Sequence, residues 1–173
     1  RHASPGKAGA GGILVLAEPL LTQISEAFLQ SLPAARSLLL VLPKRTGRQD
    51  PTRPDWLESA ELLDPGYAEA VLSRVIGARA SGIVRRDDRP NPDTAFTEIA
   101  PTLVGQQLFT ADGAVPAIAE GEAMLLGRFG ELGQRVWVLS DPDILANHGL
   151  GRGDNAELLV EIMLQINPAA TAI

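Results

Sequence analysis

Short, unbroken runs of apolar residues mark the first half of the chain, and each ends at a charged residue or a proline. Residues 13–17 (ILVLA) and 38–42 (LLLVL) contain no polar side chain, which is typical of strands buried on both faces of a sheet. Between them, residues 22–32 have helical spacing and end at Pro33. The face that this helix is expected to bury consists of Ile24, Ala27, Phe28, Ser31 and Leu32. The order strand, helix, strand predicts an α/β fold.

The segment that follows the second apolar run is polar. Residues 44–64 contain prolines and few apolar side chains, so we expect a long loop that Trp56 and Leu57 pin to the body.

The next helix has clear start and stop signals. Asp64 suits the N-cap, Pro65 the first helical position and Gly77 the C-terminal stop. A short strand at 82–85 and a turn or loop at 87–93 follow.

Strand candidates with short connections dominate the chain after residue 100. They cover residues 102–109, 114–119, 122–129 and 135–139, with a hairpin signal at Glu120 and Gly121. The last helix is expected to begin at the N-cap Asp154, with Glu157 completing a capping box, and to end at Asn167-Pro168. We therefore predict a three-layer α/β domain over residues 13–173, with a sheet that is parallel at its centre and extended by antiparallel strands. The Gly-rich residues 1–12 are expected to be a flexible lead-in.

Composition excludes several classes of function. The net charge is −6 and the arginines are scattered, which disfavours nucleic acid as a partner. The chain has no cysteine, so disulfides, thiolate metal sites and cysteine nucleophiles are excluded. The apolar runs are far shorter than the ~20 residues of a membrane span. Because the chain opens with Arg1 rather than Met, we expect a fragment, in which any flanking anchor would not be seen.

Three apolar strands end in a polar residue beside a proline, and these residues are Glu18, Lys44 and Asp141. If the strands are parallel neighbours, the three side chains lie on the sheet edge where α/β proteins bind ligands. For Glu18 and Lys44 we favour simple strand ends. Asp141 directly follows the apolar run VWVL, so its carboxylate must find donors nearby.

The loop after residue 139 is rich in oxygen ligands and glycine. Its polar residues are Asp141, Asp143, Asn147, His148, Arg152, Asp154 and Asn155. The acidic residues could hold Ca²⁺ or Mg²⁺, although the spacing departs from an EF-hand, and Asx-turns and helix caps are the favoured interpretation.

Two further kinds of chemistry are disfavoured in this loop. The glycines at 149, 151 and 153 could cradle an anion, but Asp154 would repel it, and a flexible loop is favoured. Ser140, His148 and Asp141 lack the GxSxG elbow of a hydrolase nucleophile.

The segment SDPDILANHGLGRGDNAELLVEIML resembles a family of bacterial domains of unknown function that is related to the GIFT domains of gliding-motility and intraflagellar-transport proteins. LLLVLPK at 38–44 and AEGEAMLLGRFGELGQRVWVLSD before the motif are also similar to that family, and the resemblance covers most of residues 13–167. It implies a fold related to flavodoxin and class I glutamine amidotransferases, without glutaminase chemistry because the cysteine is missing. The motif positions that it marks are Asp141, Asp143, Asn147, Gly149, Asp154 and Asn155.

The resemblance also carries expectations about context. It implies an extracytoplasmic domain of a membrane-anchored bacterial protein, with the transmembrane segments outside this chain and a link to a MoxR-type ATPase system. Members of that family have a further strand–helix unit before the one that corresponds to residues 13–32, so we expect this chain to lack the first strand–helix unit of its domain.

Two functions remain open from the sequence. The favoured one is a non-catalytic ligand- or partner-binding domain that needs no cofactor, in which Asp141 and Asn155 brace the loop while Asn147, His148 and Arg152 present its surface. The alternative is a hydrolase, acting on carbohydrate, with Asp141 or Asp143 as general base.

Overall fold

A computed structural model describes residues 12–31, 37–53, 57–77, 81–87, 92–130 and 135–168. The strands are β1 (Ile13–Ala17), β2 (Ser37–Val41), β3 (Arg45–Gln49), β4 (Leu57–Leu62), β5 (Ser81–Arg86), β6 (Asp93–Thr94), β7 (Gln106–Ala111), β8 (Val115–Glu120), β9 (Ala123–Phe129) and β10 (Val136–Leu139). The helices are η1 (Leu21–Gln23), α1 (Glu26–Ser31), α2 (Pro65–Ile76), η2 (Pro142–Ile144), α3 (Asn147–Leu150) and α4 (Asn155–Ile166).

The main sheet is mixed, which confirms an α/β fold. Its strands run in the order β1-β2-β10-β9-β7-β5, and β8 and β6 extend it from β9. Only β1, β2 and β10 are parallel neighbours, and the other pairings are antiparallel. The parallel strands therefore lie at one end of the sheet and not at its centre, because β9 runs into β10 through a short connection that favours antiparallel pairing.

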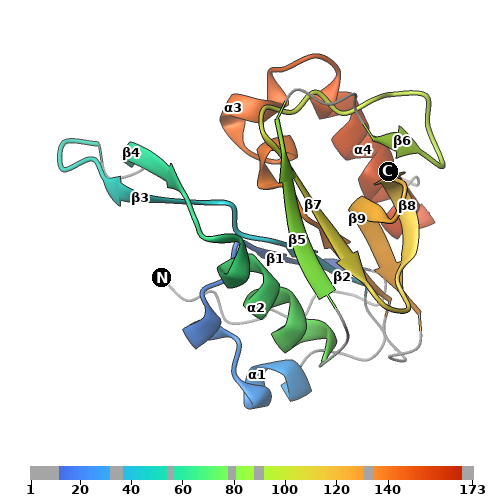
Figure 1. The fold of residues 1–173 in the computed structure, drawn as a ribbon, viewed down its shortest axis with the longest axis horizontal. Helices are drawn as coiled ribbons and strands as arrows, with labels where there is room; N and C mark the ends of the chain where they lie inside the picture. Colours follow the sequence, from blue (N-terminus) through green and yellow to red (C-terminus); the bar gives the residue numbers. More distant parts are fainter. Residues whose placement is uncertain are drawn as a thin grey trace.

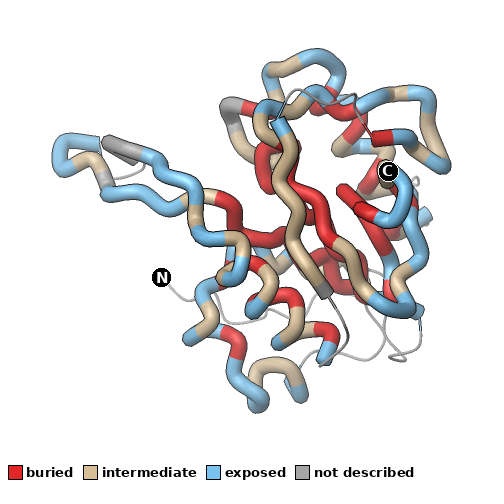
Figure 2. The backbone as a smooth tube through the Cα atoms, viewed as in Figure 1, coloured by how far each residue is buried: buried red, intermediate tan, exposed pale blue. Residues whose placement is uncertain are grey.

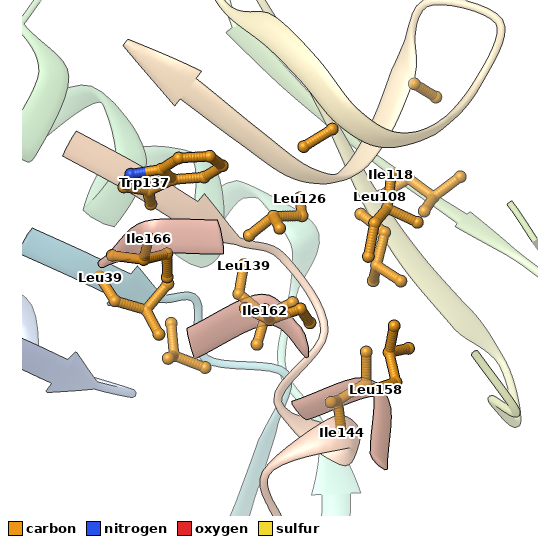
Figure 3. Packing of buried hydrophobic residues seen from close by; sticks show 14 residues of the cluster. Leu39, Leu108, Ile118, Leu126, Trp137, Leu139, Ile144, Leu158, Ile162 and Ile166 are labelled. Carbon is orange, nitrogen blue, oxygen red and sulfur yellow. The ribbon is translucent and has the colours of Figure 1, made fainter. Parts of the chain in front are cut away.

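Helices cover both faces of the sheet (Figure 1). On one face, Leu158, Ile162 and Ile166 of α4 pack over side chains of β2 and β10 such as Leu39 and Leu139 (Figure 3). On the other face, α2 packs its buried side over the alternate side chains of the same strands. β2 and β10 are thus buried on both faces, as their apolar sequences predict.

β1 has the predicted bounds but not the predicted burial. It pairs with β2, and Val15 is 40% exposed, so β1 is an edge strand of the described sheet. The helix expected at 22–32 is also corrected. The short helix η1 comes first, and α1 begins only at Glu26 because the Ser25 hydroxyl accepts from the Phe28 amide and caps the helix there. Ile24 is buried but precedes α1, and Leu32 lies outside the described residues.

Residues 44–64 are not the expected long loop. β3 and β4 pair antiparallel into a two-stranded sheet of their own, which we call the arm. The arm projects from the body (Figure 1), and most of its described length is exposed (Figure 2). Leu57 opens β4, whereas Trp56 lies outside the described residues. Polar strands pair here without the alternation of a half-buried strand, so no periodicity in these residues indicates a strand.

The two long helices differ in how well their starts were predicted. α2 has the predicted Asp64 cap, whose carboxylate accepts from the Gly66 amide, and ends at Gly77. Asp154 occupies the N-cap position of α4 but makes no side-chain capping bond, so the expected capping box with Glu157 is not formed. None of the helices among the described residues is long and apolar enough to cross a membrane.

The predicted hairpin between β8 and β9 is present. Gly121 adopts a φ of 62° there, which glycine tolerates without strain. Residues 87–93 were expected to form a turn or loop. Asp93 instead begins β6, and residues 88–91 lie outside the described residues.

Candidate functional site

A fully buried lysine links the carboxyl ends of β2 and β10. The Lys44 ammonium group donates to Asp141 Oδ2 and to Asp143 Oδ2, each at 2.7 Å, and to the Val104 carbonyl at 3.2 Å. Lys44 and Asp141 have no exposed surface, and Asp143 is 4% exposed. We call these three residues the Lys44 cluster.

Strand pairing explains why these distant residues meet. β10 runs parallel to β2, with Leu139 opposite Val41, so both chains leave the sheet at the same edge. The Leu42 amide continues the pairing by donating to the Leu139 carbonyl. This confirms that Lys44 and Asp141 share one sheet edge, and it corrects the interpretation of Lys44 as a simple strand end.

Every recorded donor to the Asp141 carboxylate is internal. In addition to Lys44, the backbone N–H of Gln107 donates to Asp141 at 2.9 Å, and the backbone N–H of Asp143 donates at 3.0 Å. Burial raises the pKa of Asp141, and the nearby Lys44 charge only partly opposes this effect. Burial also opposes ionisation of Asp143, but hydrogen bonds from Lys44 and Arg45 outweigh it and lower the pKa of that carboxyl.

A second set of polar contacts connects the Lys44 cluster to the base of the arm. Arg85, on β5, donates to the carbonyls of Leu63 and Lys44, which lie where the two arm strands leave the body. The Arg85 guanidinium also donates to the Gln107 side chain at 2.8 Å and 3.0 Å. Arg45, at the start of β3, reaches Asp143 at 3.3 Å. The arm is therefore clamped at its base by charged hydrogen bonds.

Ser140 and Gln107 complete the buried network. The Ser140 hydroxyl donates to the Gln107 carbonyl at 2.6 Å and lies near two further backbone carbonyls of β9. The Gln107 side-chain amide donates to the carbonyls of Pro43 and Ser140. Because the Ser140 hydroxyl is buried among backbone acceptors, it is not placed to attack a substrate.

Asn155 and Gly149 hold the loop after Asp143 in place. The Asn155 side chain accepts from the Thr102 amide at 2.8 Å and donates to the carbonyls of Thr102 and Gly149 at 2.9 Å. A Cβ atom on Gly149 would lie 1.5 Å from the Asp143 carbonyl oxygen, so only glycine fits. Gly153 has a φ of 46° and packs against Thr102. Gly149 and Gly153 serve close packing, which argues against the favoured interpretation of this segment as a flexible loop.

The remaining candidate residues do not join the Lys44 cluster. Glu18 is exposed at the end of β1, with a φ of 43°. Arg152 is half-buried and Asp154 is exposed. Asn147 and His148 belong to α3, but their side chains are not among those described.

The position of Lys44 also bears on the metal alternative. Its ammonium group occupies the space between the two carboxylates where a cation would bind. Among the described residues, no group of three His, Asp or Glu side chains could hold a metal ion.

Three polar residues around the cluster had no individual signal in the sequence. Gln107 and Arg85 lie within strands, and Arg45 begins the arm, which was expected to be a loop. Gln107 follows Gly105 and Gln106 and precedes the apolar Leu108 and Phe109, so its neighbours in the sequence do not indicate that its side chain is buried and bonded.

Comparison of the chain with models of known protein families and with curated protein sequences found no match.

Proposed function

We propose that the protein is a non-catalytic, extracytoplasmic ligand- or partner-binding domain of a bacterial membrane-anchored protein. The observation that carries this proposal is the internal use of both conspicuous carboxylates. Asp141 and Asp143 are buried and bonded to Lys44, backbone amides and Arg45, so their role is to brace the sheet edge and the arm.

The hydrolase alternative is less well supported. A general base must come within hydrogen-bond distance of the proton that it removes, directly or through one water. Asp141 has no exposed surface, and its neighbours already supply three donors. A substrate would therefore have to displace Lys44 or open the strand ends.

The finer assignment of fold and context rests on the sequence resemblance. A flavodoxin-like or glutamine amidotransferase-like fold is supported by three parallel strands with helices on both faces. The periplasmic or exterior location and the link to a MoxR-type ATPase system rest on the resemblance alone.

The arm is the surface best suited to contact a partner. A two-stranded sheet is marginally stable by itself, so the buried clamp at its base has to hold it in position. The arm exposes Arg48 and Glu61 along its length and Leu62 at its base, opposite Arg45, and Leu62 is 55% exposed although it is apolar. The loop with Asn147, His148 and Arg152 is proposed as a second contact region.

Site-specific photocross-linking in bacterial envelope membranes tests this proposal. A photoreactive residue is placed at Ala60 on the arm, at Arg152 in the loop, or at the exposed Asp112 of the β7–β8 turn as a matched control. We expect a discrete adduct from Ala60 or Arg152 and none from Asp112. Failure to form an adduct at both test positions, or equal labelling at Asp112, would contradict partner binding.

An activity assay tests the alternative. Envelope polysaccharide is incubated with the protein, and newly formed reducing ends are measured. We expect no release above a blank. Release that Asp141→Asn abolishes in a folded variant would favour the hydrolase.

A further inference from the structure

We propose that a cavity on the α4 face of the sheet binds a small carboxylate with an apolar body. The cavity has a volume of about 160 Å³ and lies between β8, β9, β10 and the C-terminal end of α4. None of its lining residues belongs to the Lys44 cluster or to the arm. Its lining residues include apolar side chains, one arginine and a tryptophan whose indole N–H is buried and unpaired.

The register of the sheet brings the key side chains together. Arg128 on β9 lies opposite Trp137 of β10 on one side and opposite Val115 of β8 on the other. Directly opposed residues point to the same face of a sheet, so these three side chains form a row. Trp137 packs with Ile162 and Ile166, which places the row on the face that α4 covers (Figure 3).

Arg128 supplies a cation that has no carboxylate partner among the described residues. Its guanidinium carbon lies 5.9 Å from the centroid of the Trp137 ring, near the outer limit of a cation–π contact. The side chain is exposed at the cavity, in a chain whose net charge is −6. A guanidinium without a carboxylate partner keeps its N–H fork available for a planar carboxylate.

Trp137 supplies the second polar feature. The residue is 4% exposed, and its Nε1–H is buried with no hydrogen-bond partner in the described part of the chain. In Figure 3 the ring nitrogen lies on the side away from Leu126, at the margin of the hydrophobic cluster. A buried donor without an acceptor is unfavourable, so an acceptor brought by a ligand would stabilise the site.

The rest of the lining sets the size and polarity of the ligand. Phe96, Pro116 and Ala117 form apolar walls, and the exposed Gln165 of α4 lies at the opening. A cavity of about 150 Å³ is known to accept one benzene molecule. The match of an apolar wall, a free guanidinium and an N–H donor points to a monocarboxylate with a body about the size of one ring.

Titration with benzoate, with benzyl alcohol as its uncharged counterpart, tests the site. The chain contains two tryptophans, so Trp56→Phe leaves Trp137 as the only reporter of fluorescence and of the indole N–H resonance in NMR. We expect benzoate to shift that resonance and to change the fluorescence saturably, and benzyl alcohol to bind more weakly by about tenfold or more.

Two arginine variants in the Trp56→Phe background separate recognition from a general charge effect. Arg128→Gln should weaken benzoate binding by about tenfold or more, whereas Arg135→Gln, at an exposed arginine that does not line the cavity, should leave it unchanged. Circular dichroism and cooperative urea unfolding without ligand verify that each variant is folded, because Arg128→Gln removes a contact with the Trp137 ring and changes its ligand-free resonance. An unresponsive Trp137 resonance, equal affinity for benzyl alcohol, or equal loss in both variants would overturn the proposal.

Discussion

Replacing Lys44 by methionine is the most direct test of the buried cluster. Methionine keeps the length of the side chain but removes the ammonium group, which donates to Asp141 and Asp143 at 2.7 Å and to the Val104 carbonyl at 3.2 Å. The two buried carboxylates then lose the ammonium group between them, and only Arg45 still reaches Asp143. We expect a large loss of stability with little change in secondary structure.

The magnitude follows from the burial of all three groups. Removal of one partner from a buried ion pair typically costs roughly 3–5 kcal/mol, because the remaining charge is left uncompensated. Backbone donors still reach Asp141, and Arg45 still reaches Asp143, so a value near the lower limit, about 3 kcal/mol, is expected. That is a large part of the roughly 5–15 kcal/mol by which domains are stable.

Urea unfolding at neutral pH measures this loss as a shift of the midpoint at constant slope. Arg135→Met is the matched control, because Arg135 is an exposed cation and such substitutions usually change stability by less than about 0.5 kcal/mol. The variant Lys44→Met should also become relatively more stable as pH falls from 7. Burial raises the pKa of Asp141, and without the opposing Lys44 charge it is raised further in the folded state, so folding takes up protons.

Two results would refute this reasoning. The first is a loss below about 1 kcal/mol, the range of an exposed pair. The second concerns the combined variant in which Asp141→Asn and Asp143→Asn are added to Lys44→Met. That variant has no unpaired charge and should be more stable than Lys44→Met alone; if it is less stable, charge burial is not the cause.

Three further predictions concern the same region. The pKa of Asp143 is lower in the folded state than its unfolded value of 3.8. The stability that this carboxylate contributes is therefore present above pH 3.8 and is lost as pH falls through the folded pKa. In urea unfolding, the difference in stability between wild type and Asp143→Asn should be larger at pH 7 than below pH 4. Gly149→Ala should destabilise by at least about 2 kcal/mol, whereas Gly151→Ala, where the added Cβ meets no atom within 4 Å, should not, and equal thermal shifts would contradict the packing argument. Asn155→Ala removes three hydrogen bonds from a buried side chain and should cost about 2–3 kcal/mol, while Asp154→Ala should cost less than about 0.5 kcal/mol because its carboxylate caps nothing; the reverse order would restore the capping box.

Features with local causes were predictable from the sequence. The bounds of α2 follow from Asp64, Pro65 and Gly77, each of which acts within one helical turn. The strands of the parallel end were found because their apolar runs are continuous.

Features that depend on distant partners were not predictable in the same way. The residues next to Lys44 mark only the end of a strand. Its role becomes apparent only when β10 brings Asp141, 97 residues away, to the same sheet edge. The arm was missed for a related reason. Its polar strands are held by each other and by Arg85, so neither periodicity nor β-propensity marks them.

The position of β2 has a consequence for how the chain acquires its structure. Leu38 pairs with Leu14 on one side, within a short stretch of sequence, and with Val136 on the other, far along the sequence. During synthesis the second side of β2 must therefore wait, with its apolar side chains and backbone groups unpaired, until β10 has been made. Contacts between such distant segments close slowly, and open strand edges aggregate in the meantime. Nascent chains that stop before β10 should consequently depend on chaperones, and the completed chain should gain its protease resistance late and in a single step.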